Sequence, residues 1–556
     1  MQVISINEAM IMPNSLRRVL PAALSVVLAA LLILPLLPVP SEAAESVWQT
    51  DQPLIQEASG FQDTQDHWAW AWIQLAYQRG LVSGVSSTQY APDKALTRAA
   101  FVTLLYRAAG APAVRLTTVN EAGETVRKQY FSDVPAGKWY EEPVIWAYET
   151  GLTAGKTPGL FAPDEGTSRE QMCVFLVKFA QLQGKTLTPK TSMVPFSDDS
   201  DISRWAKDAV YLLQRCGLVS GVGSGRFAPK RAMTRAEAAV LLVSYLRYTG
   251  QLTPTRNLVD PTKTIGYDQL CTDLRELAVE YPELIHLSSA GTSYEGRDIP
   301  MITFGRGSKY IYTQANIHAR EHQTTNFVLE VLDEYAYAYL TSGTYDGYNV
   351  RDLLDKFTIV LLPRVNPDGT NIAQNGFDAA KDPAAVKKMI GANKGAAQWK
   401  ANAQGTDLNR NFPCYWAQLG TGPASENYGG PSASSAPETK AVLAAMKKYS
   451  YVCYLDIHMA GNVIYFCNPG IDSAYYNRSK AFAQKLCSKT GYTLAYSNDI
   501  KTDHSAAAYA RNQFRVPSLT VELTASTTFP HDSGKFYSEI WPYVKDLYLE
   551  AMTYYK

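Results

Sequence analysis

The sequence predicts a multidomain chain in which an all-α repeat module precedes an α/β domain with a mixed, mostly parallel sheet. One pattern of residues recurs three times between residues 61 and 250. After a polar, proline-bearing stretch, short apolar runs then alternate with helical ones. A chain of 556 residues with 46% hydrophobic content is also too long for one ordinary domain and apolar enough for several cores.

The charge composition excludes some classes of partner. The chain has 52 Lys plus Arg and 52 Asp plus Glu. This balance provides no global field that would draw the protein to nucleic acid or to an anionic membrane. We therefore expect no nucleic-acid partner, and a charged partner must bind at a local site.

Residues 1–44 are expected to be a signal peptide. Two arginines at 17–18 precede an apolar run at 19–39, and small residues follow around Ala44. A membrane anchor is the alternative, because about 20 apolar residues can span a bilayer. Prolines near the end of the run favour cleavage, and no later segment is long and apolar enough to span. We expect a secreted protein that is not held in the membrane after cleavage.

Each repeat predicts a helix, a loop and a second helix. After the tryptophan that opens each repeat, glycines follow at offsets 12 and 16, a proline at 24 and an arginine at 30. The first helix ends at a glycine that suits a left-handed C-cap, and a Thr or Ser N-cap precedes the second helix. The tryptophans are Trp68, Trp139 and Trp205, and the N-caps are Thr97, Ser168 and Thr234. The repeats span residues 58–110, 128–184 and 193–250.

These repeats resemble the S-layer homology (SLH) repeat. Each one has Phe-x-Asp shortly before its tryptophan, and the arginines lie in Thr-Arg-Ala-Ala, Ser-Arg-Glu-Gln and Thr-Arg-Ala-Glu. The resemblance implies noncovalent binding to an anionic secondary polymer of the bacterial cell wall, and hence a location at the cell wall or S-layer. It also implies polymer contacts by Arg98, Arg169 and Arg235, because guanidinium pairs well with carboxylate or phosphate. Alternatively, each arginine pairs only within its own repeat.

Residues 251–264 are predicted to be a linker, because they are polar, contain proline and follow no helical or strand period. The α/β domain is expected over 265–556. A strand-like run at 309–314 leads into His318 and Glu321, whose spacing lets both side chains bind one metal ion. Alone this pattern is weak, because a histidine and a glutamate at a helix start often have no metal.

Two further strand-like runs strengthen the metal-site prediction. The run at 451–457 ends on His458, and the run at 518–523 places Glu522 in an otherwise apolar strand. A carboxylate there is costly to bury unless it has a partner or a chemical task. These residues therefore mark strand ends, where open α/β sheets place their sites.

The ordered motifs resemble the M14 family of zinc carboxypeptidases. They are Asn-Ile-His-Ala-Arg-Glu-His at 316–322, Asn-Pro-Asp-Gly at 366–369, Gly-Thr-Asp-Leu-Asn-Arg-Asn at 405–411, the strand ending in His458, and Thr-Val-Glu at 520–522. The resemblance implies a zinc carboxypeptidase-like fold over roughly 265–556. It also implies one Zn²⁺ per catalytic domain.

The resemblance assigns roles to individual residues. His318, Glu321 and His458 would bind zinc and leave a fourth position for water. Glu522 would take a proton from that water and pass it to the departing amine. The remaining assignments are Asp407 as the residue that orients a zinc histidine, Asn409 and Arg410 as the grip on a terminal carboxylate, and Arg320 in the neighbouring subsite.

One position departs from the family pattern. Where the family has Trp-Arg, with the arginine stabilising the tetrahedral oxyanion, this chain has Trp399-Lys400. Lysine supplies the charge without the planar fork, so we expect Lys400 to serve as the catalytic cation with less directional control. The same stretch resembles the M14 branch that cleaves γ-D-glutamyl-diaminopimelate bonds in peptidoglycan peptides.

Three functions remain open from the sequence. The first is a wall-anchored metallocarboxypeptidase that acts at the C-termini of ordinary peptides. The second is a peptidoglycan γ-D-glutamyl-diaminopimelate peptidase, and the third is a structural surface-layer protein with an inactive peptidase domain. Arg511 or Arg515 could enter the specificity pocket, and Tyr496 is assigned as the family's mobile tyrosine from its position only.

The seven cysteines are scattered and odd in number, which argues against a disulfide framework. None is in a Cys-x-x-Cys pair, so a thiolate zinc site is not expected. Cys453 and Cys467 flank two strands that look adjacent in sequence. They are the best candidates for a single bridge.

Overall fold

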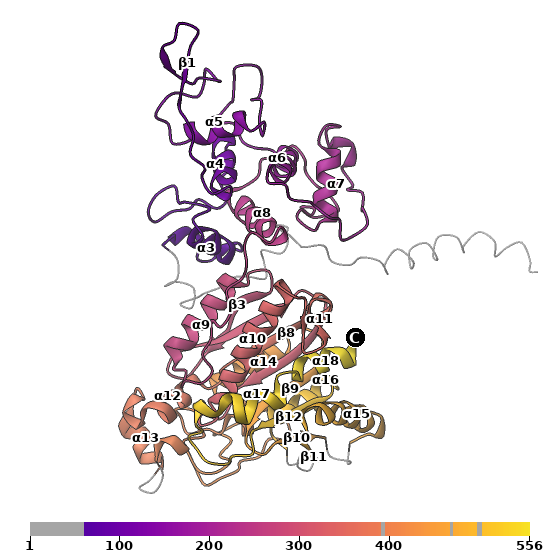
Figure 1. Cartoon of the computed structure of the whole chain (residues 1–556). Coiled ribbons are helices and arrows are strands. Elements are labelled where there is room, and N and C mark those ends of the chain that lie inside the picture. Colours follow the sequence, from indigo (N-terminus) through magenta and orange to yellow (C-terminus); the bar gives the residue numbers. More distant parts are fainter. Residues whose placement is uncertain (1–59, 391–394, 468–470, 497–502) are drawn as a thin grey trace, which may run out of the picture.

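The computed structural model describes residues 60–390, 395–467, 471–496 and 503–556. The predicted signal peptide at 1–44 lies outside the described residues. Within those ranges, none of the helices combines the length and the apolar character needed to cross a bilayer. Figure 1 shows a helical N-terminal module that lies at one end of an α/β domain.

The helical module contains two main helices from each repeat. They are α3 (Trp70–Gln78) and α4 (Arg98–Ala108), α5 (Glu141–Glu149) and α6 (Arg169–Leu182), and α7 (Lys207–Arg215) and α8 (Arg235–Tyr248). The module also contains two short 3-10 turns, η2 (Gln62–Thr64) and η3 (Asp199–Asp201), and a hairpin of β1 (Thr117–Val119) and β2 (Thr125–Arg127). The helix, loop and helix pattern predicted for each repeat is confirmed.

Local capping explains where these helices begin and end. The side chains of Thr97, Ser168 and Thr234 each accept a backbone hydrogen bond at the start of the second helix, as predicted. Gly80 follows the first helix of its repeat with φ 68°. This left-handed conformation favours glycine, which explains the glycine twelve residues after each opening tryptophan.

The three arginines join the repeats in a closed ring. Arg98 Nε donates to Phe161 O (2.9 Å), Arg169 Nε to Phe227 O (2.8 Å) and Arg235 Nε to Tyr90 O (2.7 Å). Each guanidinium also lies over the ring of the residue whose carbonyl accepts its hydrogen bond. The first repeat therefore contacts the second, the second the third, and the third the first. The alternative of pairing only within one repeat is wrong, and polymer binding by these arginines stays a prediction.

The α/β domain is built on one eight-stranded sheet in the order β11-β10-β12-β9-β5-β8-β4-β3. Its strands are β3 (Ile285–Thr292), β4 (Asp298–Gly305), β5 (Lys309–Ala315), β8 (Phe357–Leu362), β9 (Tyr451–Met459), β10 (Val463–Phe466), β11 (Thr493–Tyr496) and β12 (Ser518–Leu523). The central strands β12, β9, β5 and β8 are parallel, whereas β4 and β3 at one edge pair antiparallel. The predicted mixed, mostly parallel sheet is confirmed.

Helices surround this sheet (Figure 1). The longer ones are α9 (Tyr267–Glu280), α10 (Gln323–Leu340), α14 (Pro437–Met446), α15 (Ser473–Thr490), α16 (Ala506–Phe514) and α18 (Leu547–Tyr555). The shorter ones are α11 (Val350–Lys356), α12 (Pro367–Asn375), α13 (Pro383–Ile390) and α17 (Trp541–Val544). Between them lie a small β6–β7 pair (Thr344–Tyr345 and Tyr348–Asn349) and the short helical turns η4 (Phe377–Ala379), η5 (Ala396–Gln398), η6 (Leu408–Arg410), η7 (Ser533–Lys535) and η8 (Phe536–Ile540).

The two parts of the chain are packed together. Arg247 of α8 lies 2.8 Å from Glu283 and 3.4 Å from Glu280, and Arg79 lies 2.9 Å from Glu280. The segment at 251–264 forms no helix or strand, but Arg256 within it pairs with Glu334 of α10 at 2.9 Å. The segment is thus held against the α/β domain by specific contacts.

All seven cysteines are free. The predicted bridge between Cys453 and Cys467 is wrong for a topological reason. Cys453 is in β9 and Cys467 directly follows β10, but β12 lies between these strands. Two strand spacings of about 4.8 Å each exceed the Cα separation that a disulfide tolerates.

Candidate metal centre and active site

The candidate metal centre lies where three parallel strands end. β5 ends at Ala315, and the following turn carries His318 and Glu321, while β9 carries His458 near its end. Asn316 adopts φ 54°, in the left-handed region that asparagine tolerates, and its Nδ2 donates to His318 O (2.9 Å). This local bond fixes the turn that presents His318.

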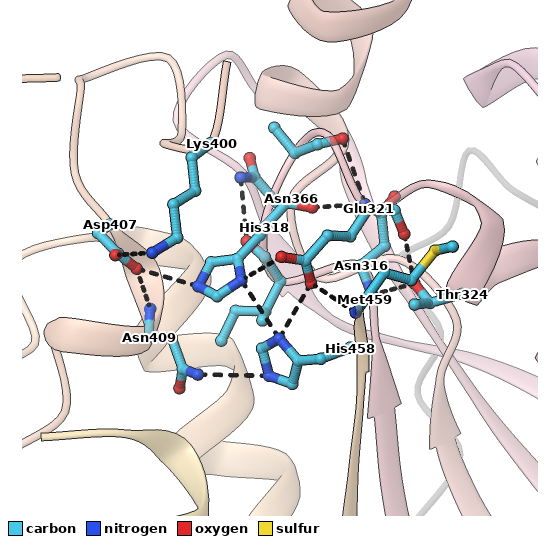
Figure 2. A network of polar contacts seen from close by, with 12 residues as sticks. Asn316, His318, Glu321, Thr324, Asn366, Lys400, Asp407, Asn409, His458 and Met459 are labelled. Atoms are coloured by element: carbon cyan, nitrogen blue, oxygen red, sulfur yellow. Dashed lines mark hydrogen bonds and ion pairs between the residues drawn. The ribbon is translucent and has the colours of Figure 1, made fainter. Parts of the chain in front are cut away.

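Three potential ligand groups converge in this place. Figure 2 shows His318 and His458 pointing their imidazoles toward the Glu321 carboxylate. His318 Nδ1 lies 2.8 Å from Glu321 Oε1, and His458 Nδ1 lies 3.0 Å from Glu321 Oε2. The two Nδ1 atoms lie 3.2 Å apart, and all three side chains are buried.

The donor set fits zinc. One ligand atom from each residue lies within 4.8 Å of the others. Two imidazole nitrogens facing one carboxylate are the ligand types that Zn²⁺ takes in catalytic sites. Two inward-facing nitrogens this close also need a cation or a proton between them, so the geometry is suited to a bound metal ion.

Neighbouring carboxylates orient the two histidines from outside. His318 Nε2 lies 3.3 Å from Asp407, the carboxylate expected to orient a zinc histidine, and His458 Nε2 lies 3.1 Å from Asp456. A carboxylate on Nε2 keeps the proton there and leaves Nδ1 for a metal. Asp456 was not predicted, although its place two residues before His458 puts it on the same face of β9.

The charged groups of the metal centre shift one another's pKa values. Burial alone would raise the pKa of Glu321, but His318 and His458 hold it below its usual value. Burial opposes a charged His458, yet Asp456 and Glu321 raise its pKa well above the ordinary value. Burial would likewise raise the pKa of Asp407, and Lys400 and His318 keep it well below the usual range. Nearby positive charges therefore favour the ionised form of the Glu321 and Asp407 carboxylates.

Glu522 lies beside the metal centre on the neighbouring strand. β12 runs parallel to β9, and Glu522 is in register with His458. Burial raises the pKa of Glu522 to about 8, and Glu321 and Asp456 add to that rise while His458 opposes it. A glutamate with this environment is suited to accept and release a proton near neutral pH.

The other predicted site residues surround the same place. Lys400 Nζ lies 2.8 Å from Asp407 Oδ2, so its charge is held close to His318 (Figure 2). Asn409 Nδ2 lies 3.3 Å from His458 Nε2, and its Oδ1 accepts a hydrogen bond from Ala506 N (2.9 Å).

Arg410 and Arg320 are both half-buried. Arg410 donates to Asn409 O (2.9 Å), next to the centre. Arg320 lies over the Phe529 ring at 4.6 Å. The structure thus places both near the metal centre, and their substrate contacts remain a prediction.

The two arginines considered for the specificity pocket and the tyrosine assigned as the family's mobile tyrosine lie in different surroundings. Arg511 is buried and donates to Asp503 (3.1 Å), whereas Arg515 pairs with Asp472 and lies over Tyr475. Tyr496 ends the edge strand β11 and stacks on Tyr476 with its hydroxyl bonded there.

Comparison with known proteins identifies the family. The γ-D-glutamyl-L-diamino acid endopeptidase 1 of Lysinibacillus sphaericus is 30% identical over 283 residues, which cover 49% of this chain and 69% of that protein. The chain belongs to the zinc carboxypeptidase family, Peptidase M14. The profile of this family matches residues 270–546, and that of the S-layer homology domain matches 60–102, 130–173 and 195–239.

Other relatives cover parts of the chain. Carboxypeptidase B of Astacus astacus is 29% identical over 36% of this chain and 62% of that protein. The amylopullulanase of Thermoanaerobacterium thermosulfurigenes is 32% identical over 34% of this chain but only 10% of its own length. The solved carboxypeptidase A of Helicoverpa armigera aligns with 54% of this chain and 76% of that chain, at 21% identity and a TM-score of 0.43.

Membership of the zinc carboxypeptidase family confirms several predictions. The protein is a zinc metallopeptidase, and zinc is its cofactor. The three SLH repeats are confirmed, and they indicate association with the cell surface.

Proposed function

We propose that this protein is a wall-anchored zinc peptidase that hydrolyses peptidoglycan peptides between γ-D-glutamate and a diamino acid. The hydrolytic part is supported by one observation above all. His318, Glu321 and His458 converge on one point, and Glu522 is in register with His458 on the adjacent strand.

The residues of the site have distinct tasks in this reaction. His318, Glu321 and His458 would hold zinc, which when bound supplies a Lewis acid that polarises a carbonyl and acidifies water. Glu522 accepts a proton from the attacking water and later gives it to the departing amine. Lys400 brings positive charge to the side of the site that Asp407 occupies, where it stabilises developing negative charge.

The substrate class is supported by the chain's relatives and by its own sequence. The endopeptidase from Lysinibacillus sphaericus is named for the γ-D-glutamyl-L-diamino acid bond. Lys400 replaces the arginine of the usual family pattern, and the cell-surface association that the SLH repeats indicate is consistent with a peptidoglycan substrate. A soluble digestive role would not need such an anchor.

A C-terminal carboxypeptidase acting on ordinary peptides is the second candidate. It is favoured by the pair Asn409 and Arg410, which lies next to His458 and could hold a terminal carboxylate. The third possibility, an inactive surface-layer protein, is disfavoured because three side chains that could hold zinc converge and Glu522 is in register with one of them.

Cleavage of two substrates by the zinc-loaded full chain tests the proposal. One is an L-Ala-γ-D-Glu-diaminopimelate peptide, and the other is a peptide with a free L-residue at its C-terminus. We expect release of diaminopimelate-containing product from the first substrate only. Release of the L-residue alone would establish the carboxypeptidase instead, and no cleavage of either despite bound zinc would favour the inactive protein.

A Glu522→Gln variant tests whether the activity depends on this site. We expect kcat to fall by about 10²–10⁴-fold, because general base catalysis contributes that much, with zinc content unchanged. Glu121→Gln, in an exposed loop of the helical module, is the matched control and should retain full activity.

We also infer that the repeats bind an anionic secondary wall polymer. Arg98 and Arg169 are buried between repeats, whereas Arg235 is half-exposed and remains the arginine best placed for an external anion. Sedimentation with purified walls tests this. Arg235→Gln should reduce the bound fraction, and walls stripped of the polymer should bind neither protein.

A further inference from the structure

A β-hairpin extends from the helical module between the first and second repeats. It consists of β1 and β2, and it lies at the end of the module that is farther from the peptidase domain (Figure 1). The S-layer homology profile matches residues 60–102 and 130–173, so the hairpin belongs to neither repeat. Neither wall attachment by the repeats nor hydrolysis at the zinc site accounts for it.

Local contacts fix the turn and the second strand of this hairpin. Asn120 Oδ1 accepts hydrogen bonds from Ala122 N (3.0 Å) and Glu124 N (2.9 Å), which closes the turn. On β2, Arg127 Nε donates to Glu141 Oε1 (2.7 Å) and Nη2 donates to Oε2 (2.6 Å) at the start of α5. The helical module therefore holds β2, and β1 forms the outer strand.

The outer edge of β1 is open. The hydrogen bond from Lys128 N to Leu116 O (2.9 Å) shows that residue 116 faces β2. Because bonding alternates along an antiparallel strand, the N–H and C=O groups of Thr117 and Val119 point away from β2. Among the described strands β1 pairs only with β2, and all three of its residues are exposed.

This edge lacks the usual protection against pairing with another chain. Edge strands are commonly protected by a lysine, a proline or a bulge, but β1 is Thr-Thr-Val and contains none of these. Opposite charges instead lie beyond its two ends, with Arg115 before it and Glu121 after it. Both side chains are exposed, and neither has an ion-pair partner within the part of the chain that the structure describes.

We propose that β1 binds β1 of a second copy of this chain in antiparallel orientation, so that two hairpins form one four-stranded sheet. A two-fold axis passes through Thr118, which makes the interface isologous. Thr117 of one copy faces Val119 of the other, and each such pair exchanges both of its N–H···O bonds. The open edges of the two β1 strands cover each other.

Charge selects this register over its neighbours. Arg115 lies two residues before β1 and Glu121 two residues after it, so pairing about Thr118 places Arg115 opposite Glu121 of the second copy, and the symmetry repeats this pair. A shift by two residues keeps the backbone bonding pattern but removes both ion pairs, and a shift by one turns the bonding groups away. Oppositely charged cross-strand pairs stabilise a sheet, whereas like charges destabilise it.

Sedimentation equilibrium of the full chain over a wide range of concentrations tests this pairing. The paired strands are short and bury less than the about 1,200 Å² of a standard interface, so we expect a weak, concentration-dependent dimer. Arg115→Glu places like charges opposite each other twice, and it should lower the association constant at least about tenfold. Combining it with Glu121→Arg should restore the dimer. A monomer at every concentration, or no recovery in the combined variant, would overturn the proposal.

Disulfide trapping tests the register directly. Thr118→Cys puts two thiols on the two-fold axis, where Cα atoms of a non-hydrogen-bonded pair lie about 4.5 Å apart, a separation that a disulfide tolerates. We expect a covalent dimer after mild oxidation. Thr125→Cys, exposed on β2, is the matched control, because about 14 Å, or three strand spacings, separates it from its equivalent. The unmodified chain gives the background of the seven native cysteines. Equal dimer yields from the two variants would contradict this register.

Folding and activity are followed separately. Far-UV circular dichroism should be the same in all hairpin variants, because the changed side chains are exposed. The hairpin is in the helical module and the zinc-binding residues are in the peptidase domain, so hydrolysis of a soluble peptide should not depend on pairing.

Discussion

A single buried carboxylate would favour the His458 tautomer whose Nδ1 is available to a metal ion. Asp456 lies 3.1 Å from His458 Nε2 and is itself held by Gln314 Nε2 at 3.0 Å. Asp456→Asn would weaken the preference for a proton on Nε2. We expect about 10–100-fold weaker zinc affinity, the usual effect of losing such a partner, measured by competition with a chelator.

Asp503→Asn is the matched control for that experiment. Asp503 is also a buried aspartate, but its partner is Arg511 rather than a zinc-binding residue. Its loss should leave zinc affinity unchanged. Equal zinc affinity in Asp456→Asn and the unmodified enzyme would contradict the orienting role.

Single residues also show how far sequence predicts a site. His318, Glu321, His458 and Glu522 could be predicted because each belongs to an ordered motif at a strand end. Asp456 was missed, although it is also a carboxylate in an apolar strand and lies on the same face of the strand as His458; its contact with the histidine is seen only in the folded sheet. The contact between Lys400 and Asp407 likewise joins a turn and a loop whose approach no local pattern specifies.

Glu330 of α10 predicts a pH dependence of stability. It is buried, it accepts a hydrogen bond from Tyr537 Oη (2.7 Å), and burial raises its pKa to about 7. The unfolded chain loses this proton near pH 4.3. The protonated form therefore stabilises the fold fully below about pH 4.3, and this contribution is lost as the pH rises toward 7.

Glu330→Gln should remove that dependence. At pH 8 we expect the variant to be more stable by about 1–3 kcal/mol, because the amide is neutral and can still accept the hydrogen bond. At pH 4.5 the difference should be small. Thermal unfolding at both pH values measures this, with Glu121→Gln at an exposed position as control. A variant that is less stable at pH 8 would contradict the assignment of a buried, protonated glutamate.

At the scale of elements, helices were predictable and strand order was not. Helix starts and ends depend on residues close in sequence, such as the Thr234 cap whose side chain and backbone form a capping box with Glu237. Strand pairing joins residues far apart. The insertion of β12 between β9 and β10 therefore escaped prediction, and the proposed bridge between Cys453 and Cys467 failed for that reason.

The inter-repeat arginines make the three helix pairs depend on one another. Arg98 is buried, donates to Phe161 O at 2.9 Å and lies over its ring at 5.0 Å. We expect Arg98→Ala to destabilise the helical module by about 2–4 kcal/mol, because it leaves a buried carbonyl unpaired and opens a cavity. Chemical denaturation followed by far-UV circular dichroism measures the change.

Arg107→Ala is the control for this experiment, since Arg107 is only partly buried in the last turn of the same helix. It should change stability by less than about 0.5 kcal/mol. If Arg98→Ala kept full stability but lost wall binding, the arginine would be a polymer ligand rather than a structural contact.

At the scale of the whole molecule, a buried ion-pair cluster determines whether the two parts unfold together. Arg247 of the helical module is 7% exposed and pairs with Glu283 (2.8 Å) and Glu280 (3.4 Å) of the peptidase domain. Apolar residues of both parts also form one continuous core. Interfaces between domains usually permit relative motion unless they are extensive and apolar. This interface meets that condition, so the enzyme should behave as one rigid unit between wall and substrate.

Removing Arg247 tests this coupling. Arg247→Ala leaves Glu280 and Glu283 with less compensation in a buried place, which typically costs about 3–5 kcal/mol. We expect one calorimetric transition for the unmodified chain and two for the variant, because each part of the variant then unfolds on its own. Arg107→Ala, at the corresponding last turn of α4 but away from the peptidase domain, should keep one transition. A single, unshifted transition in Arg247→Ala would mean that the apolar contacts alone couple the two parts.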